Sequence, residues 1–147
     1  SQESSLDREL LDRVFTRIDE AIAMSAIWTG WHLRVKAIAA MTQTGATAQW
    51  MSRINCGVPI FALTPDEHTR NQMTLYRQVT PILVSQLHQD RDEMLWEAEK
   101  ILLERGIVAY DDLIALTIGE PIGVPGGTNT LKIVRVGQTL RASVPPV

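Results

Sequence analysis

Short apolar segments alternate with helical segments through the middle of the sequence, and this alternation limits the fold more than any other feature. Apolar runs cover residues 36–42, 59–63 and 80–85, and a helical segment follows each of them. Strands that are each followed by a helix form a parallel sheet with both faces covered, because the helix returns the chain to the end of the sheet at which the strands begin. We therefore expect an α/β fold.

Capping residues predict where the helices begin and end. The first of these helices is expected over Ala46–Ile54. Thr64 and Glu67 have the spacing of a capping box, so we expect Thr64 to cap the second helix. Asp90 is expected to cap the third helix, which should end at Gly106 because glycine commonly follows the last helical turn.

The C-terminal part departs from the alternation. Residues 112–118 and 131–136 have the composition of a fourth and a fifth strand, and they are separated by GEPIGVPGG. A segment so rich in glycine and proline cannot form the crossover helix that a parallel return needs, so the fifth strand should run antiparallel at the sheet edge. The expected fold is a three-layer α/β/α sandwich on a five-stranded mixed sheet.

A long helix is expected ahead of the sheet, over residues 6–33. Its apolar residues recur at helical spacing, and its charged residues, Asp19 and Glu20 among them, fall mostly on the other side. Trp28 and Trp31 share one face of this helix and are expected in the core or at an interface. The expected divisions are a linker and helix start at 1–11, one domain at 12–137 and a flexible tail at 138–147.

Size, charge and cysteine content exclude several classes of protein. The 147 residues fit one domain, and a net charge of −3 argues against a protein that coats nucleic acid or an anionic membrane. No stretch approaches 18 uninterrupted apolar residues, so no transmembrane helix is expected. A single cysteine allows no internal disulfide, and the cytoplasm is the expected location. The sequence does not begin with methionine, so we expect it to belong to a longer chain.

The loop TQTGATA, between the first strand and the helix after it, is the main candidate site. Amides at a helix start, with threonine hydroxyls and a glycine beside them, are typical of a site that binds an anion. The alternative is that Thr44 only caps the helix and that Gly45 only turns the chain. Both interpretations remain open from the residues alone. The candidate residues are Thr42, Gln43, Thr44, Gly45, Ala46 and Thr47.

Several segments together resemble a known family. KAIAAMTQTGATAQWMSR, VPIFALTP, LYRQVTPIL and GGTNTLKIVRV resemble, in order and spacing, the C-terminal domain of pyruvate kinase across residues 12–137. The resemblance implies the same α/β/α sandwich with an antiparallel last strand. It also implies a parent enzyme that transfers the phosphoryl group of phosphoenolpyruvate to ADP with magnesium and potassium ions. That parent is usually a homotetramer, with one contact between C-terminal domains.

The resemblance places all catalytic groups and metal ligands in a separate barrel domain. We therefore expect no catalytic residue, metal site or cofactor in this chain, and no activity from it alone. The three histidines agree with this, since they are scattered without metal-ligand spacing. The alternative is a free-standing sensor of a phosphorylated metabolite that never had a barrel. An enzyme acting on its own fits the sequence least.

The resemblance also implies an allosteric effector pocket in this domain. Its second wall would include Gly126, Gly127 and Thr128, and the alternative is that this segment is a plain turn connection. Ala46 stands where the family often has a lysine or arginine, and Arg91 is the only cation near the start of the third helix. A charge-assisted contact to phosphate is about twice as strong as a neutral one. We therefore expect a sugar monophosphate or a nucleotide monophosphate as effector, and no response to fructose 1,6-bisphosphate.

Overall fold

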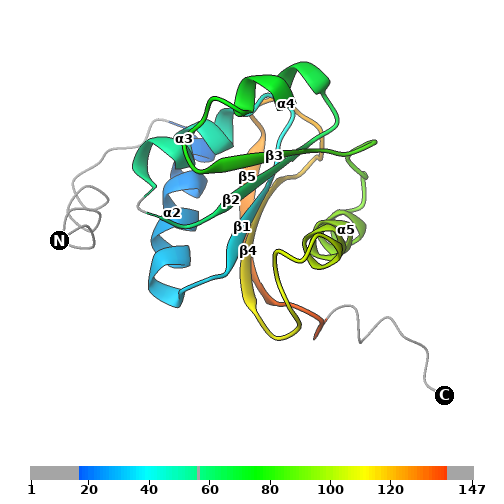
Figure 1. Ribbon diagram of the computed structural model, residues 1–147. Helices are drawn as coiled ribbons and strands as arrows, with labels where there is room; N and C mark the ends of the chain where they lie inside the picture. Colours follow the sequence, from blue (N-terminus) through cyan, green and yellow to red (C-terminus); the bar gives the residue numbers. More distant parts are fainter. Residues whose placement is uncertain (1–16, 56, 139–147) are drawn as a thin grey trace.

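The computed structural model describes residues 17–55 and 57–138, which form one five-stranded sheet with helices on both faces (Figure 1). The strand order is β3-β2-β1-β4-β5, with β1 to β4 parallel and β5 antiparallel to β4. The expected mixed sheet with an antiparallel last strand is thus confirmed. The strands are β1 (Ala37–Met41), β2 (Ile60–Thr64), β3 (Val79–Leu83), β4 (Leu113–Gly119) and β5 (Thr128–Arg135).

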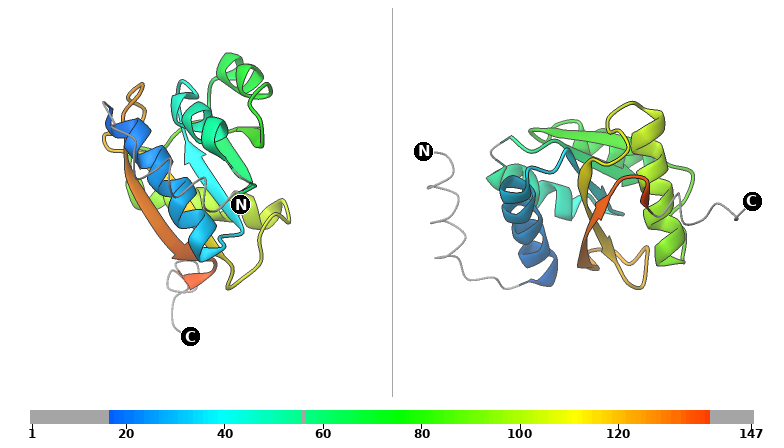
Figure 2. Two further views of the ribbon diagram at one scale, coloured as in Figure 1. Left: turned by 90° about the vertical axis from the view of Figure 1, so that its left-hand side faces the viewer. Right: turned by 90° about the horizontal axis from the view of Figure 1, so that it is seen from below.

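Within the described residues, four helices cover the sheet. α2 (Ile18–Leu33) and α3 (Ala46–Ile54) pack on one face, and α5 (Arg91–Glu104) packs on the other (Figures 1 and 2). α4 (Glu67–Met73) contacts β2 and β3 and buries its last residue in the core of the first face. The predicted bounds of α3 are confirmed, and Gly106 follows the end of α5 with a φ of 70°.

Every residue of β1 is buried, because the strand lies at the centre of the sheet. Ala37, Ala39 and Met41 face α5, whereas Ile38 and Ala40 face α2 and α3. An apolar run without alternation is what a strand covered on both faces requires. The small alanines let helices approach closely from either side, and Gly30 has the same role on α2. A Cβ on Gly30 would lie 3.1 Å from Cγ2 of Val35.

The first helix differs from its prediction. Arg17 is extended, with φ −132° and ψ 143°, and α2 begins only at Ile18. Ile18 is 69% exposed, whereas Asp19 is 2% and Glu20 6% exposed, so the expected polar face is the buried one. Burial is tolerated because the Asp19 carboxylate accepts the N–H of Glu20 and pairs with Arg17. The rest of the predicted helix, residues 6–16, lies outside the described residues.

The predicted cap of the second helix is wrong. The N-cap residue of α4 is Asp66, whose Oδ1 accepts the N–H of Thr69 at 3.1 Å. Thr64 is the last residue of β2, and its hydroxyl accepts the N–H of Asp66. The predicted cap of α5 is confirmed, because Oδ1 of Asp90 accepts the N–H of Glu93 at 2.9 Å. The predicted domain bounds stay a prediction, and both predicted end segments lie almost wholly outside the described residues.

Candidate functional site

A narrow pocket lies at the carboxyl ends of β1 and β4. The chain leaves β1 toward β2 on one side, and later places β4 on the other side of β1, so the strand order reverses between β1 and β4. Such a reversal leaves a crevice above the strand ends, where α/β proteins commonly bind ligands. Seven of the nine predicted site residues line this pocket: Thr42, Gln43, Thr44, Thr47, Gly126, Gly127 and Thr128.

One wall of the pocket is built by the loop between β1 and α3. Oγ1 of Thr42 accepts the N–H of Gly45 at 2.8 Å, which holds the loop in a tight turn. Oγ1 of Thr44 accepts the N–H of Ala46 at a longer 3.3 Å. The amides of Gly45 and Ala46 therefore already donate within the loop. In the described part of the chain, the amide of Thr47 is the one at this helix start that has no such bond within the loop. The positive end of the α3 dipole lies behind it.

The second wall is the start of β5, and a hydroxyl pair joins it to the first. Oγ1 of Thr47 donates to Oγ1 of Thr128 at 2.8 Å, and both residues are buried. The two residues are 81 positions apart in the sequence. This bond brings the two predicted halves of the site together.

Gly45 and Ala46 are predicted site residues that do not line the pocket. Gly45 adopts a φ of 81°, and a Cβ there would lie 3.1 Å from Cγ of Met73 in α4. The glycine is therefore needed for a left-handed turn and for close packing on α4. Its loop is also tied to α4, because Oγ1 of Thr69 donates to the carbonyl of Gln43 at 2.9 Å.

The pocket has an apolar side that the sequence reasoning missed. Met41 and Ile118 stand at the ends of predicted strands, where parallel strands present their carboxyl ends together, so these two could have been inferred. Nothing local in the sequence marks the residues from the loops before α5 and after β4. The missed apolar lining residues are Met41, Leu87, Ile118, Ile122 and Val124.

The pocket is nearly closed. Its volume is about 20 Å³, and a single water molecule needs about 10–15 Å³ by this measure. A larger hollow of about 270 Å³, which includes Trp31, Arg34 and Pro59 in its lining, lies at the amino ends of β1 and β2. The narrow pocket is the better candidate despite its size, since ligands of α/β sheets bind beyond the carboxyl ends of the strands.

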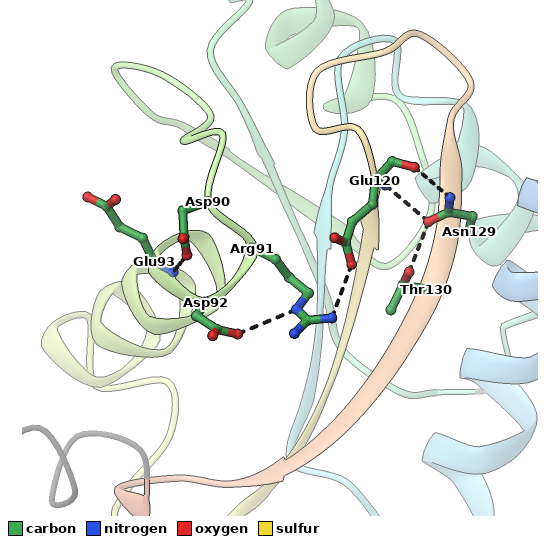
Figure 3. A network of polar contacts seen from close by, with 7 residues as sticks. All are labelled: Asp90, Arg91, Asp92, Glu93, Glu120, Asn129 and Thr130. Atoms are coloured by element: carbon green, nitrogen blue, oxygen red, sulfur yellow. Dashed lines mark hydrogen bonds and ion pairs between the residues drawn. The ribbon is translucent and has the colours of Figure 1, made fainter.

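No lysine or arginine lines the narrow pocket in the described part of the chain. Arg91 stands nearby and contacts two carboxylates, with Nη1 3.3 Å from Oε1 of Glu120 and Nε 3.4 Å from Oδ1 of Asp92 (Figure 3). Glu120, and then Asp92, raise the pKa of Arg91 above its ordinary value. This guanidinium therefore stays charged, with two carboxylates already beside it.

Arg91 and Asn129 fasten the connection between β4 and β5. The side-chain oxygen of Asn129 accepts the N–H of Glu120 at 3.1 Å, and its amide group donates to the Glu120 carbonyl at 2.9 Å (Figure 3). Together with the ion pair from Arg91, these bonds hold the connection against the start of α5 and the start of β5. The connection between β4 and β5, which closes the pocket, is thus held in place by bonds to Glu120.

Three further observations concern residues 17–55 and 57–138. No group of three or more histidine, aspartate or glutamate side chains there has the arrangement of a metal site. His88 is placed between two carboxylates of α5, Glu93 and Glu97. None of the helices in this part of the chain is long and apolar enough to cross a bilayer.

Comparisons with known proteins agree on one family. Residues 20–134 match the family described as the pyruvate kinase alpha/beta domain. The chain is 39% identical to pyruvate kinase II of Salmonella typhimurium over 133 residues, which are 90% of this chain and 28% of that protein. It is 36% identical to a pyruvate kinase of Staphylococcus haemolyticus over 127 residues, 86% of this chain and 22% of that protein.

A solved structure shows the same fold. The crystal structure of a pyruvate kinase from Cryptosporidium parvum matches with a TM-score of 0.76 and 21% sequence identity. The match covers 92% of this chain and 26% of that one. At this identity the likeness concerns the fold alone. The chain thus spans about a quarter of the length of the relatives that it matches.

Proposed function

Because the chain belongs to the family of pyruvate kinase alpha/beta domains, we propose that it is the C-terminal regulatory and oligomerisation domain of a pyruvate kinase. The rest of the protein would supply a catalytic barrel that transfers a phosphoryl group from phosphoenolpyruvate to ADP in glycolysis, in the cytoplasm. Magnesium and potassium ions would serve that barrel. The proposal is supported by the share of each relative that the chain covers, 28% of the Salmonella enzyme.

The isolated chain is proposed to be inactive. Phosphoryl transfer needs convergent cations and metal-holding carboxylates around the reacting group. The pocket at the carboxyl ends of β1 and β4 is lined, among described residues, by hydroxyls, one amide side chain, glycines and aliphatic groups. A coupled assay of pyruvate formation should show no turnover by the purified chain, with an intact pyruvate kinase as positive control. Turnover by the chain alone would refute this part of the proposal.

We propose that the pocket binds a phosphorylated effector. The observation that carries this role is the meeting of Thr42, Thr47 and Thr128 at the point where the strand order reverses. Hydroxyls and a helix start suit one phosphate group, and the aliphatic side suits the flat face of an aromatic ring such as a nucleobase. A nucleotide monophosphate therefore fits the lining better than a sugar monophosphate, whose hydroxyls would face Leu87, Ile122 and Val124.

A guest of that size needs the β4–β5 connection to move, because the pocket holds about 20 Å³ as it stands. Opening and reclosing this segment would couple effector binding to the rest of the protein, since loop ordering is a common switching device. The second phosphate of fructose 1,6-bisphosphate would find no free cation among the described lining residues. We expect that compound to bind no more tightly than a monophosphate.

Thermal unfolding with candidate ligands tests the effector role. A ligand that binds only the folded chain stabilises it by about 2.7 kcal/mol at a hundred times its Kd. That stabilisation corresponds to a rise in Tm of roughly 5–10 °C for a chain near this size. Adenosine 5′-monophosphate should raise the Tm, and glucose 6-phosphate should raise it less. If no phosphorylated compound shifts the Tm at millimolar concentration, the effector proposal fails.

We also propose that the chain forms a contact with a second copy of itself through α2 and the edge strand β5. α2 exposes three large apolar side chains, with Ile18 69%, Trp28 43% and Leu33 47% exposed. β5 lies beside α2 and ends the sheet, so its outer edge can pair with another strand. Sedimentation equilibrium should show a dimer that Trp28→Ala weakens. Leu75→Ala, at a residue 85% exposed beyond α4, is the matched control and should have no effect.

A further inference from the structure

Arg17 is a cation that lies against the pocket without being part of its lining. Its Nη2 atom is 3.2 Å from the position that a Cβ would take on Gly126. Gly126 and the two residues after it line the pocket. The start of α2 accordingly lies beside the β4–β5 connection (Figure 2). The guanidinium is therefore separated from the interior of the pocket by only the thickness of this glycine segment.

The guanidinium of Arg17 is held in a fixed plane. Its Nε donates to Oδ1 of Asp19 at 2.9 Å, and its Nη2 donates to Oδ2 at 2.8 Å. Asp19 is itself anchored, because it is 2% exposed and accepts the N–H of Glu20 at 2.9 Å. A guanidinium has five N–H groups, and the two bonds to Asp19 use two of them. The other edge of the fork can still bind an acceptor.

Arg17 suits an anion better than the other cation near the pocket. Arg91 contacts two carboxylates on two of its nitrogens, so a phosphate would compete with both (Figure 3). Among the described residues Arg17 contacts one carboxylate, on one edge, and its side chain is 53% exposed. Asp19 accepts from Nε and Nη2, and a second anion can accept from the remaining N–H groups of the guanidinium. Arginine can bind two anions in its plane in this way, whereas lysine cannot.

We propose that Arg17 provides the cationic contact to the phosphate of the bound effector, and that Asp19 is a positioning residue that aims it. This inference rests on the effector role proposed above. When the glycine segment shifts to admit a guest, the outer N–H groups of Arg17 donate to phosphate oxygens. The hydroxyl of Thr42 and the backbone N–H of Thr47 donate to the same group from the opposite wall. The site thus obtains its positive charge from the residue before α2, outside the loop that carries the threonines.

Titration calorimetry with adenosine 5′-monophosphate and with adenosine tests this assignment on the 147-residue chain. Arg17→Gln should weaken binding of the monophosphate about tenfold to a hundredfold, the loss of a charge-assisted hydrogen bond. Binding of adenosine, which has no phosphate, should not change. Arg17→Lys keeps the charge but loses the planar fork of N–H groups. Its affinity for the monophosphate should lie between those of the unmodified chain and of Arg17→Gln. Arg105→Gln makes the same change of net charge at a distant exposed site and is the control.

The outcomes separate this inference from the effector role. If the unmodified chain binds the monophosphate and Arg17→Gln binds it equally well, the assignment of Arg17 is overturned and the effector role survives. Equal weakening of adenosine and its monophosphate would also overturn it, because a residue that only braces the loop affects both. If Arg17→Gln does not fold, the same two affinities are measured for Asp19→Asn and Arg17→Lys. Each of these variants should weaken binding of the monophosphate and leave binding of adenosine unchanged, and any other result would overturn the assignment. If the unmodified chain binds neither the monophosphate nor inorganic phosphate, both proposals fail.

Discussion

The hydroxyl pair of Thr47 and Thr128 joins the two walls of the pocket, and replacing Thr47 by valine tests how much that junction contributes to stability. Valine has nearly the same shape as threonine and the same branching at Cβ, so no cavity forms and α3 keeps its first turn. The bond of 2.8 Å is lost, and the hydroxyl of Thr128 remains without its partner. Its residue is 7% exposed and lines the pocket of about 20 Å³, so at most a single water molecule can take the place of the lost partner.

The expected loss in the free energy of unfolding is about 1–3 kcal/mol, the cost of leaving a buried polar group unsatisfied. Replacing both residues by valine removes the orphaned hydroxyl, and such paired replacement is often nearly neutral. The double variant should therefore be more stable than either single one. A double-mutant cycle measured by urea unfolding gives the coupling between the two residues directly.

Two results would contradict this reasoning. A Thr47→Val variant as stable as the unmodified chain would mean that the hydroxyl pair contributes nothing. A double variant whose loss equals the sum of the single losses would mean that the two residues do not interact, and that the walls of the pocket are held together by other contacts. Thr44→Val, at an exposed position of the same loop, is the control and should change stability little.

Three further substitutions test local features of the fold by urea unfolding. Gly45→Ala should cost about 2 kcal/mol or more, because a side chain there is strained and meets Met73, whereas Gly106→Ala has equal strain with open space and should cost about 1 kcal/mol; equal losses would remove the packing role of Gly45. Asp66→Ala should cost about 1 kcal/mol as the loss of a helix cap, and no loss would refute the cap. Asn129→Ala should cost about 1–2 kcal/mol, because two hydrogen bonds to the start of the β4–β5 connection disappear; an unchanged stability would show that this connection is held elsewhere.

The sheet and most of its helices could be predicted because their signals are local. A run such as AIAAM, without alternation, fits only a strand buried on both faces, and β1 is such a strand. The antiparallel direction of β5 followed from a connection that could not become a helix, and its pairing with β4 confirms it. Each of these signals depends on the backbone preferences of a few neighbouring residues.

The errors arose where a local signal met a tertiary one. Thr64 is of a residue type that often caps helices. It is fully buried at the end of β2, so it belongs to the strand, and Asp66 caps the helix instead. Asp19 is of a residue type that usually faces solvent, but α2 begins only at Ile18, and Asp19 lies buried in its first turn. Neither outcome can be inferred from helical spacing, because spacing says nothing about which face the rest of the molecule covers.

The order of strands and helices along the chain, the direction of the last strand and the threonine loop after β1 could all be derived from the amino-acid sequence alone. Only the tertiary structure placed that loop beside Thr128, closed the pocket with aliphatic side chains and laid Arg17 against Gly126. The physical reason is the range of the forces involved. Backbone preference acts over a few residues, whereas the meeting of groups 81 positions apart is decided by how the sheet and its helices pack to bury apolar surface.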